Sequence, residues 1–301
     1  MATQQRNRSR RPSSSRQRGP RHVEAVLDPT WQSPYSPSPE ERATHHQALR
    51  HYGMRRKRLE MAVGAVIVLA LLIGTLASPW WAILGVVVAA GVVLDVRRFF
   101  SSAQRRGATL GSLVEAAFEP GGTSKDHQRL ITVIDRLAAT FGVDTVRAFI
   151  INDPGYNAAL VPNASGYALF VTSAMMRDFE LIEIEGVVAH CLARQRLGIL
   201  ERECYAAVVS GPLAQRRELA GPGLTYRADE VAAAAIRYPL GIASALRRCE
   251  RQAVPAASFF TSSGYDQWRF IWFNVWSDRS ATDLSDLDDR DWERTISISE
   301  P

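Results

Sequence analysis

The chain has 301 residues, of which 46% are apolar and 22% are charged. This is enough for one substantial core with appendages, but not for two large domains. Its three cysteines are odd in number and lack C-x-x-C spacing, which argues against a disulfide framework and against a structural zinc knuckle. Residues 1–58 carry 13 Lys and Arg against 4 acidic residues, whereas residues 59–301 carry 23 against 27, so the basic character belongs to the N-terminal part.

Residues 1–54 are predicted to form a disordered, basic, cytoplasmic tail. They are rich in Arg, Ser, Pro and Gln and nearly lack the aliphatic side chains that would offset the entropy of ordering. The first apolar run begins only near Met61, which is too late for the core of a cleaved signal peptide. We expect the tail to attract anionic lipid head groups, with a merely solvated arm as the alternative, and we predict no specific nucleic-acid partner.

The segment Met61–Leu94 contains 34 residues without a charge. As one straight helix it would be about 51 Å long at about 1.5 Å per residue, which exceeds a hydrocarbon core of about 30 Å. The Ser78-Pro79 pair at its centre disfavours a continuous helix, so two spans are predicted, at about residues 61–77 and 80–95. The alternative is a buried helical hairpin inside a soluble protein.

Basic residues bracket this hairpin, which extends over residues 55–98. Arg55–Arg58 precede it and Arg97 and Arg98 follow it, so the positive-inside rule places both ends in the cytoplasm. The sequence therefore predicts a multi-pass protein of the cell (inner) membrane with both termini cytoplasmic and membrane lipid as a partner.

Residues 107–301 are predicted to form an α+β domain that is mostly helical, has a small sheet and ends in an acidic segment. The apolar periodicity of a helix appears before Gly142, and β-branched or aromatic runs indicate two strands. Acidic residues at its start and arginines near its end mark a long helix that contains Leu181–Leu192. The strands are expected at Val146–Ile151 and Gly166–Thr172, and two further helices at Tyr226–Ile236 and at residues 266–276.

The last of these expected helices carries Trp268, Trp272 and Trp276 at intervals of four residues. Such a stripe is typical of a protein core. The alternative is contact with the bilayer interface, where Trp and Tyr are enriched.

Four stretches carry a resemblance to a known family. They are PGYNAALVP at 154–162, GYALFVTSAMM at 166–176, GVVAHCLARQRLG at 186–198 and YRADEVAAAAI at 226–236. In this order, and after a hairpin, they resemble the HtpX-like family of membrane zinc metallopeptidases over most of residues 55–250. The resemblance implies a gluzincin-like metallopeptidase domain.

The zinc motif of that family is degenerate in this chain. The family's His-Glu-x-x-His places two imidazoles on one helical face beside a catalytic Glu. The five positions here read HCLAR, with His190 at the first ligand, Cys191 at the general base and Arg194 at the second ligand. The family's third ligand is a Glu three residues before an Ala-Asp pair, and this position is Thr225.

A catalytic zinc site needs three protein ligands and an open position for water. Only one ligand remains here, and Arg194 adds a permanent positive charge that repels a dication by about 4 kcal/mol per unit charge at about 4 Å and an effective dielectric constant of about 20. We therefore expect no intact catalytic residue, no metal and no other cofactor.

The resemblance gives Asp229 the role of the aspartate that hydrogen-bonds the first histidine ligand. The alternative is a local salt bridge to Arg194 or Arg227. Cys191 next to His190 invites comparison with a cysteine nucleophile, but neighbours on a helix point about 100° apart, and a small buried thiol is the simpler interpretation.

The sequence thus predicts a membrane-anchored pseudopeptidase that binds protein or peptide segments. The strand that aligns substrate in the family offers a sheet edge for strand addition. One alternative is a divergent zinc metalloendopeptidase in membrane protein quality control, with zinc as its cofactor. Another is a structural membrane component whose cleft has closed. The expected peptide-binding edge consists of Gly166, Tyr167, Ala168, Leu169 and Phe170.

Overall fold

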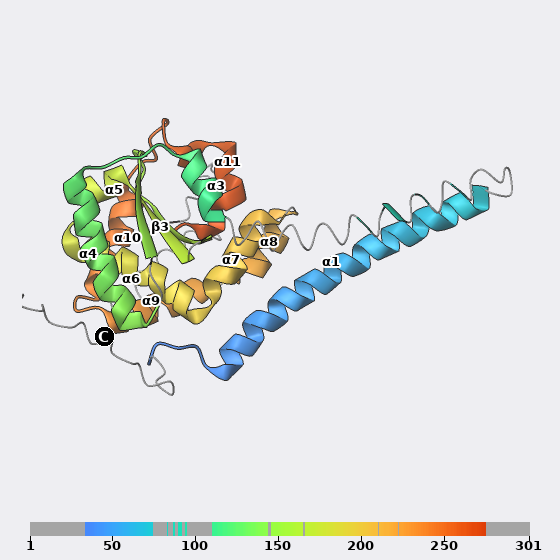
Figure 1. Ribbon diagram of the computed structural model, residues 1–301, viewed down its shortest axis with the longest axis horizontal. Coiled ribbons are helices and arrows are strands. Elements are labelled where there is room, and N and C mark those ends of the chain that lie inside the picture. Colours follow the sequence, from blue (N-terminus) through green and yellow to red (C-terminus); the bar gives the residue numbers. More distant parts are fainter. Residues whose placement is uncertain are drawn as a thin grey trace, which may run out of the picture. The chain divides into compact units, whose positions relative to one another are not determined.

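The computed structural model describes residues 34–74, 110–143, 146–164, 166–209, 211–221 and 223–274, with isolated positions between 83 and 94. These residues form a mostly helical α+β structure with a small mixed sheet, which confirms the expected class (Figure 1). The strands are β1 (Val146–Ile151), β2 (Ala158–Asn163) and β3 (Gly166–Thr172). The helices are α1 (Pro39–Gly74), α3 (Leu110–Ala117), α4 (Ser124–Phe141), α5 (Ser173–Asp178), α6 (Leu181–Leu197), α7 (Ile199–Val208), α8 (Leu213–Ala220), α9 (Leu224–Ala235), α10 (Leu240–Arg251) and α11 (Ser263–Trp268), with 3₁₀ turns η1 (Phe259–Thr261) and η2 (Arg269–Ile271).

The sheet has the order β1-β3-β2, with β3 parallel to β1 and antiparallel to β2. Strand β3 is therefore the central strand, and the expectation that Gly166–Phe170 forms a free peptide-binding edge is wrong. Its Ala168–Thr172 part is buried throughout, as is typical of a strand covered on both faces. The outer strand next to it is β2, which the sequence analysis did not identify as a strand.

Helix α1 begins inside the N-terminal tail. Ser38 and Glu41 form a capping box, in which the Glu41 N–H donates to Ser38 Oγ at 3.1 Å and the Ser38 N–H donates to Glu41 Oε2 at 2.7 Å. The structure places residues 39–54 in a helix rather than in a disordered tail. The local S-x-x-E signal explains this difference from the sequence analysis.

The same helix runs into the apolar segment as far as Gly74. Most of the remaining apolar segment lies outside the described residues, and so do residues 1–33 and the acidic residues after 274. The hairpin with its turn at Ser78-Pro79 therefore remains a prediction. No helix in the described part of the chain combines the length and the apolar character needed to cross a membrane.

Helix α6 is the central helix of the domain and contacts α4, α9 and α10 (Figure 1). It begins with a capping box between Glu180 and Glu183 and ends at Gly198, whose φ of 78° suits glycine. Helix α10 approaches it closely at Gly186, where an added Cβ would lie 2.7 Å from Ile242 N. Every residue of α6 from Glu183 to Arg194 is buried among these helices.

The helix expected at residues 266–276 does not form. Helix α11 ends at Trp268, the η2 turn follows, and Trp272 is extended. Trp272 is 2% exposed and packs against Phe118 and Phe260, which supports the core interpretation for this residue. Aromatic and β-branched residues fit a half-buried strand as well as a helix, so the four-residue spacing was misleading. Trp276 lies outside the described residues.

Candidate functional site

His190 and Asp229 meet between α6 and α9. His190 Nδ1 lies 2.7 Å from Asp229 Oδ1, and the two side chains are 1% and 0% exposed. When Asp229 is ionised, the proton of this contact lies on Nδ1, because a carboxylate only accepts hydrogen bonds. The alternative partners of Asp229 are engaged elsewhere: Arg194 contacts Glu203, and Arg227 contacts Glu41 and Glu230 at 3.0 and 3.1 Å.

Arg194 is fully buried one helical turn after His190, on the same face of α6. Its Nε donates to Glu203 Oε2 at 2.8 Å, and its Nη2 donates to the same oxygen. Nη1 donates to the carbonyl of Ile271 at 3.0 Å, and Nη2 also donates to the carbonyl of Phe270 at 2.9 Å. Burial is the largest single influence and lowers the pKa of Arg194, but the charge attraction of Glu203, the hydrogen bond to Glu203 and the nearby Cys191 and Cys204 together outweigh it, so the pKa is raised.

The sequence analysis missed Glu203, which lies on α7. In the sequence it stands in the charged run Glu201-Arg202-Glu203, so no local signal distinguished it from an exposed carboxylate. Glu203 supplies the partner for the arginine at the second ligand position. The ion pair thus occupies the face of α6 that the family uses for metal binding.

The two remaining positions of the degenerate zinc motif are Cys191, on α6, and Thr225, on α9. Cys191 is 0% exposed, as expected for a small apolar thiol and unlike a nucleophile that must reach a substrate. Thr225 is half-buried in the first turn of α9, four residues before Asp229 and therefore on the same face of that helix. The fold thus brings together the elements that carry His190, Arg194, Thr225 and Asp229.

These positions do not fit a zinc ion. Only His190 remains as a ligand, held through Nδ1 by Asp229, whereas Arg194 supplies a cation and Thr225 supplies a hydroxyl in place of a carboxylate. Within the described residues, no three His, Cys, Asp or Glu side chains gather in an arrangement that could hold a metal ion.

The chain after η2 lies beside the same site. Trp272 pairs with Ala159 of β2 in antiparallel fashion, and the Phe273 N–H donates to Ala158 O at 2.7 Å. The Phe273 ring is edge-on to His190, with ring centroids 5.2 Å apart. The sequence analysis missed this contact because it expected a helix here. The segment therefore fills the space between β2 and His190.

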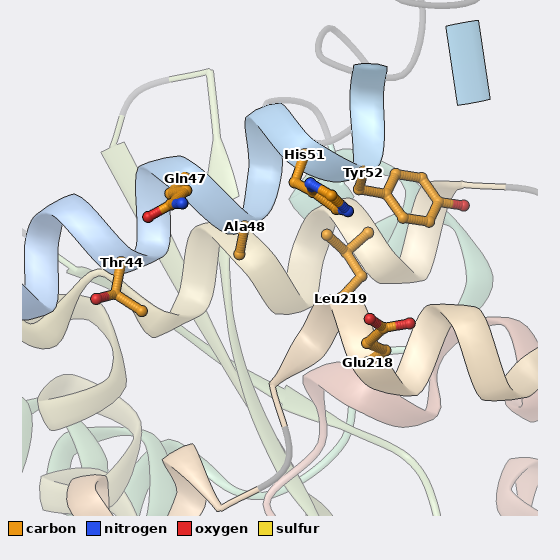
Figure 2. Close-up of a pocket in the computed structure, with 7 residues that line it drawn as sticks. All are labelled: Thr44, Gln47, Ala48, His51, Tyr52, Glu218 and Leu219. Carbon is orange, nitrogen blue, oxygen red and sulfur yellow. The ribbon is translucent and has the colours of Figure 1, made fainter. Parts of the chain in front are cut away.

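A separate hollow of about 270 Å³ lies between α1 and α8 (Figure 2). Thr44, His51 and Tyr52 of α1 line one side, and Glu218 and Leu219 of α8 line the other. None of the predicted site residues lines it. The hollow lies where α1 packs against α8 of the domain.

Two protease HtpX homologs, from Dictyoglomus thermophilum and Dictyoglomus turgidum, are similar to the chain. Each is 24% identical over 186 residues, in an alignment that covers 48% of this chain and 61% of the relative. The chain thus spans less than two thirds of the length of these relatives. No family model matches the chain, and no solved structure matches it. The chain is a distant, partial relative of the HtpX proteases.

Proposed function

We propose that this chain is a membrane-anchored, metallopeptidase-like protein that has no catalytic activity and acts by binding protein or peptide segments. The observation that carries the proposal is the buried Arg194–Glu203 pair. A guanidinium bound on several sides by a carboxylate and two carbonyls cannot act as a metal ligand, and it repels a dication.

The contrast between the two interactions on α6 supports the same conclusion. His190 keeps the aspartate partner that orients a histidine ligand, whereas the next turn of the helix has exchanged a ligand for a cation. A structural strut between α6 and α9 needs only the first of these interactions. A zinc site needs a metal ligand on each of the two helical turns.

Membrane anchoring is supported by the apolar part of α1. Helix positions spread around most of its circumference carry exposed aliphatic side chains, whereas a helix on a soluble protein buries one apolar stripe. Together with the uncharged 34-residue sequence, this favours lipid as the surrounding medium, with both termini in the cytoplasm and the cell (inner) membrane as the location. The exposed side chains are Met61, Val63, Val66, Ile67, Leu69 and Ile73.

Zinc content of the purified, detergent-solubilised full chain tests the proposal. We expect less than about 0.1 zinc per chain in the native protein. A variant that restores the family motif, with Cys191→Glu, Arg194→His and Thr225→Glu, should take up one zinc if the site geometry is that of the peptidases. Glu203→Gln is added so that no uncompensated charge remains buried.

The matched control adds His190→Ala to the restored variant, which removes a ligand and should abolish zinc uptake. Stoichiometric zinc in the native chain, with cleavage of casein that is lost in His190→Ala, would establish the alternative of a divergent zinc metalloendopeptidase. The retained His190–Asp229 pair is the observation that favours this alternative.

A further inference from the structure

The outer edge of β2 is occupied by the chain's own Trp272–Asn274 segment. Beyond the main-chain contacts of Trp272 and Phe273, the side chain of Asn157 imitates a peptide unit. Its Oδ1 accepts from the Asn274 N–H at 2.9 Å, and its Nδ2 donates to the Asn274 carbonyl at 2.7 Å. An extended peptide that adds to a sheet edge makes contacts of this kind.

Arg194 holds the start of the same segment. Its guanidinium donates to the carbonyls of Phe270 and Ile271, directly before Trp272. The residue that stands at the second ligand position therefore anchors the segment that covers His190. The loss of the metal ligand and the closure of the edge are thus connected through one side chain.

One feature weakens the docked state of the segment. Trp272 is surrounded by aromatic rings, and its Nε1–H is buried without a hydrogen-bond partner in the described structure. An unsatisfied buried donor costs free energy, which is recovered when water reaches the group. The Phe273 ring is the part of the segment that enters the site, at 1% exposure.

We propose that the Trp272–Asn274 segment is an internal ligand of the β2 edge, which closes the groove beside His190 and is displaced by an extended segment of a partner protein. Asn157 and the Ala158 carbonyl recognise the partner's main chain, and the space now filled by Phe273 takes a large apolar or aromatic side chain. The inference rests on the proposed function, because it describes how a peptide-binding groove is kept closed.

Hydrogen exchange of the full chain in detergent gives the first test. We expect the amides of Phe273 and Asn274 to exchange at least about 10-fold faster than those of Leu169–Val171 in β3, since local opening needs less free energy than global unfolding. Exchange of both groups at one common rate would overturn the proposal, because the segment would then be a permanent part of the core.

Peptide binding gives the second test. The Phe273→Gly variant removes the side chain that fills the site but leaves Asn157 intact. Asn274→Ala is the matched control, because its contacts with Asn157 use only backbone atoms. The probe is a fluorescein-labelled peptide with the sequence of residues 269–274, RFIWFN. We expect Phe273→Gly to bind it at least about 10-fold more tightly than the native chain and the control do.

A peptide N-methylated at its second Phe tests the binding mode, because it lacks the N–H that bonds Ala158. It should lose binding to Phe273→Gly at least about 10-fold. Equal binding of both peptides, or equal binding by all three chains, would overturn strand addition at β2. If β3 loses its exchange protection in Phe273→Gly, the variant has unfolded and the exchange comparison in the native chain decides.

Failure of this inference can be told apart from failure of the proposed function. A metal-free chain whose segment does not open keeps the non-catalytic function but loses the internal ligand. A zinc-loaded chain whose segment opens as expected loses the non-catalytic function but keeps the β2 edge as a peptide-binding surface.

Discussion

Arg194 Nε lies 2.8 Å from Glu203 Oε2, and both side chains are withdrawn from solvent, at 2% and 9% exposure. The two residues come from consecutive helices, α6 and α7, which Gly198 joins in a left-handed turn. This turn brings the acidic residue of α7 back to the arginine on α6. The pair compensates a charge that would otherwise be buried alone.

Glu203→Ala should destabilise the domain by about 3–5 kcal/mol, because it leaves the Arg194 cation buried without its counter-charge. The double variant Arg194→Met with Glu203→Leu should recover much of this loss, since it removes both charges. Urea unfolding followed by tryptophan fluorescence measures the difference. Arg227→Ala, at an exposed pair, is the control and should cost about 0–1 kcal/mol.

Asp229→Asn should weaken the link between α6 and α9 by about 1–3 kcal/mol, because the amide accepts less strongly than the buried carboxylate. The contact between His190 and Asp229 also has a spectroscopic signature in the native chain. ¹⁵N NMR of the native chain should show His190 with its proton on Nδ1. A proton found on Nε2 alone would contradict an ionised Asp229 that accepts from His190 Nδ1.

Docking of α1 should weaken in acid. His45 lies 3.4 Å from Arg202 through its Nδ1. Burial lowers the pKa of His45, the positive charges of Arg202 and His46 lower it further, and Glu41 opposes them. The undocked helix therefore binds more protons, so the contribution of His45 to docking is fully present above about pH 6.5 and is lost as the pH falls through the lowered pKa.

Hydrogen exchange of residues 41–52 between pH 7.5 and pH 5 measures this effect, after correction for the intrinsic pH dependence of exchange. Protection of α1 should fall relative to that of β3. His45→Gln should remove the pH dependence, whereas His51→Gln, at the neighbouring hollow, should keep it. Unchanged relative protection in the native chain would refute the role of His45.

Gly186→Ala should destabilise the domain by about 1–3 kcal/mol, because the new methyl group would meet the backbone of α10 at Ile242. Gly198→Ala leaves free space but forces alanine into a positive φ, so its cost should be about 1–2 kcal/mol and should come from strain alone. Thermal unfolding measures both losses of stability. A neutral Gly186→Ala would show that the two helices are less closely packed.

The sequence alone determined the features that depend on local patterns. The strands Val146–Ile151 and Gly166–Thr172 and the long helix around His190 are confirmed at or near their predicted bounds, because side-chain periodicity and end signals act within a few residues. Helical spacing also showed that His190 and Arg194 share a face. The His190–Asp229 contact was implied by the family resemblance, and the geometry agrees with it.

Only the tertiary structure decided how these elements combine. The central position of β3, the pairing of Arg194 with Glu203, and the Trp272–Asn274 segment on β2 all depend on contacts between residues far apart along the chain or on which neighbour a charge selects. A strand's local pattern is the same whether one or two strands pair with it. Likewise, a buried arginine reveals its counter-charge only after the helices have packed.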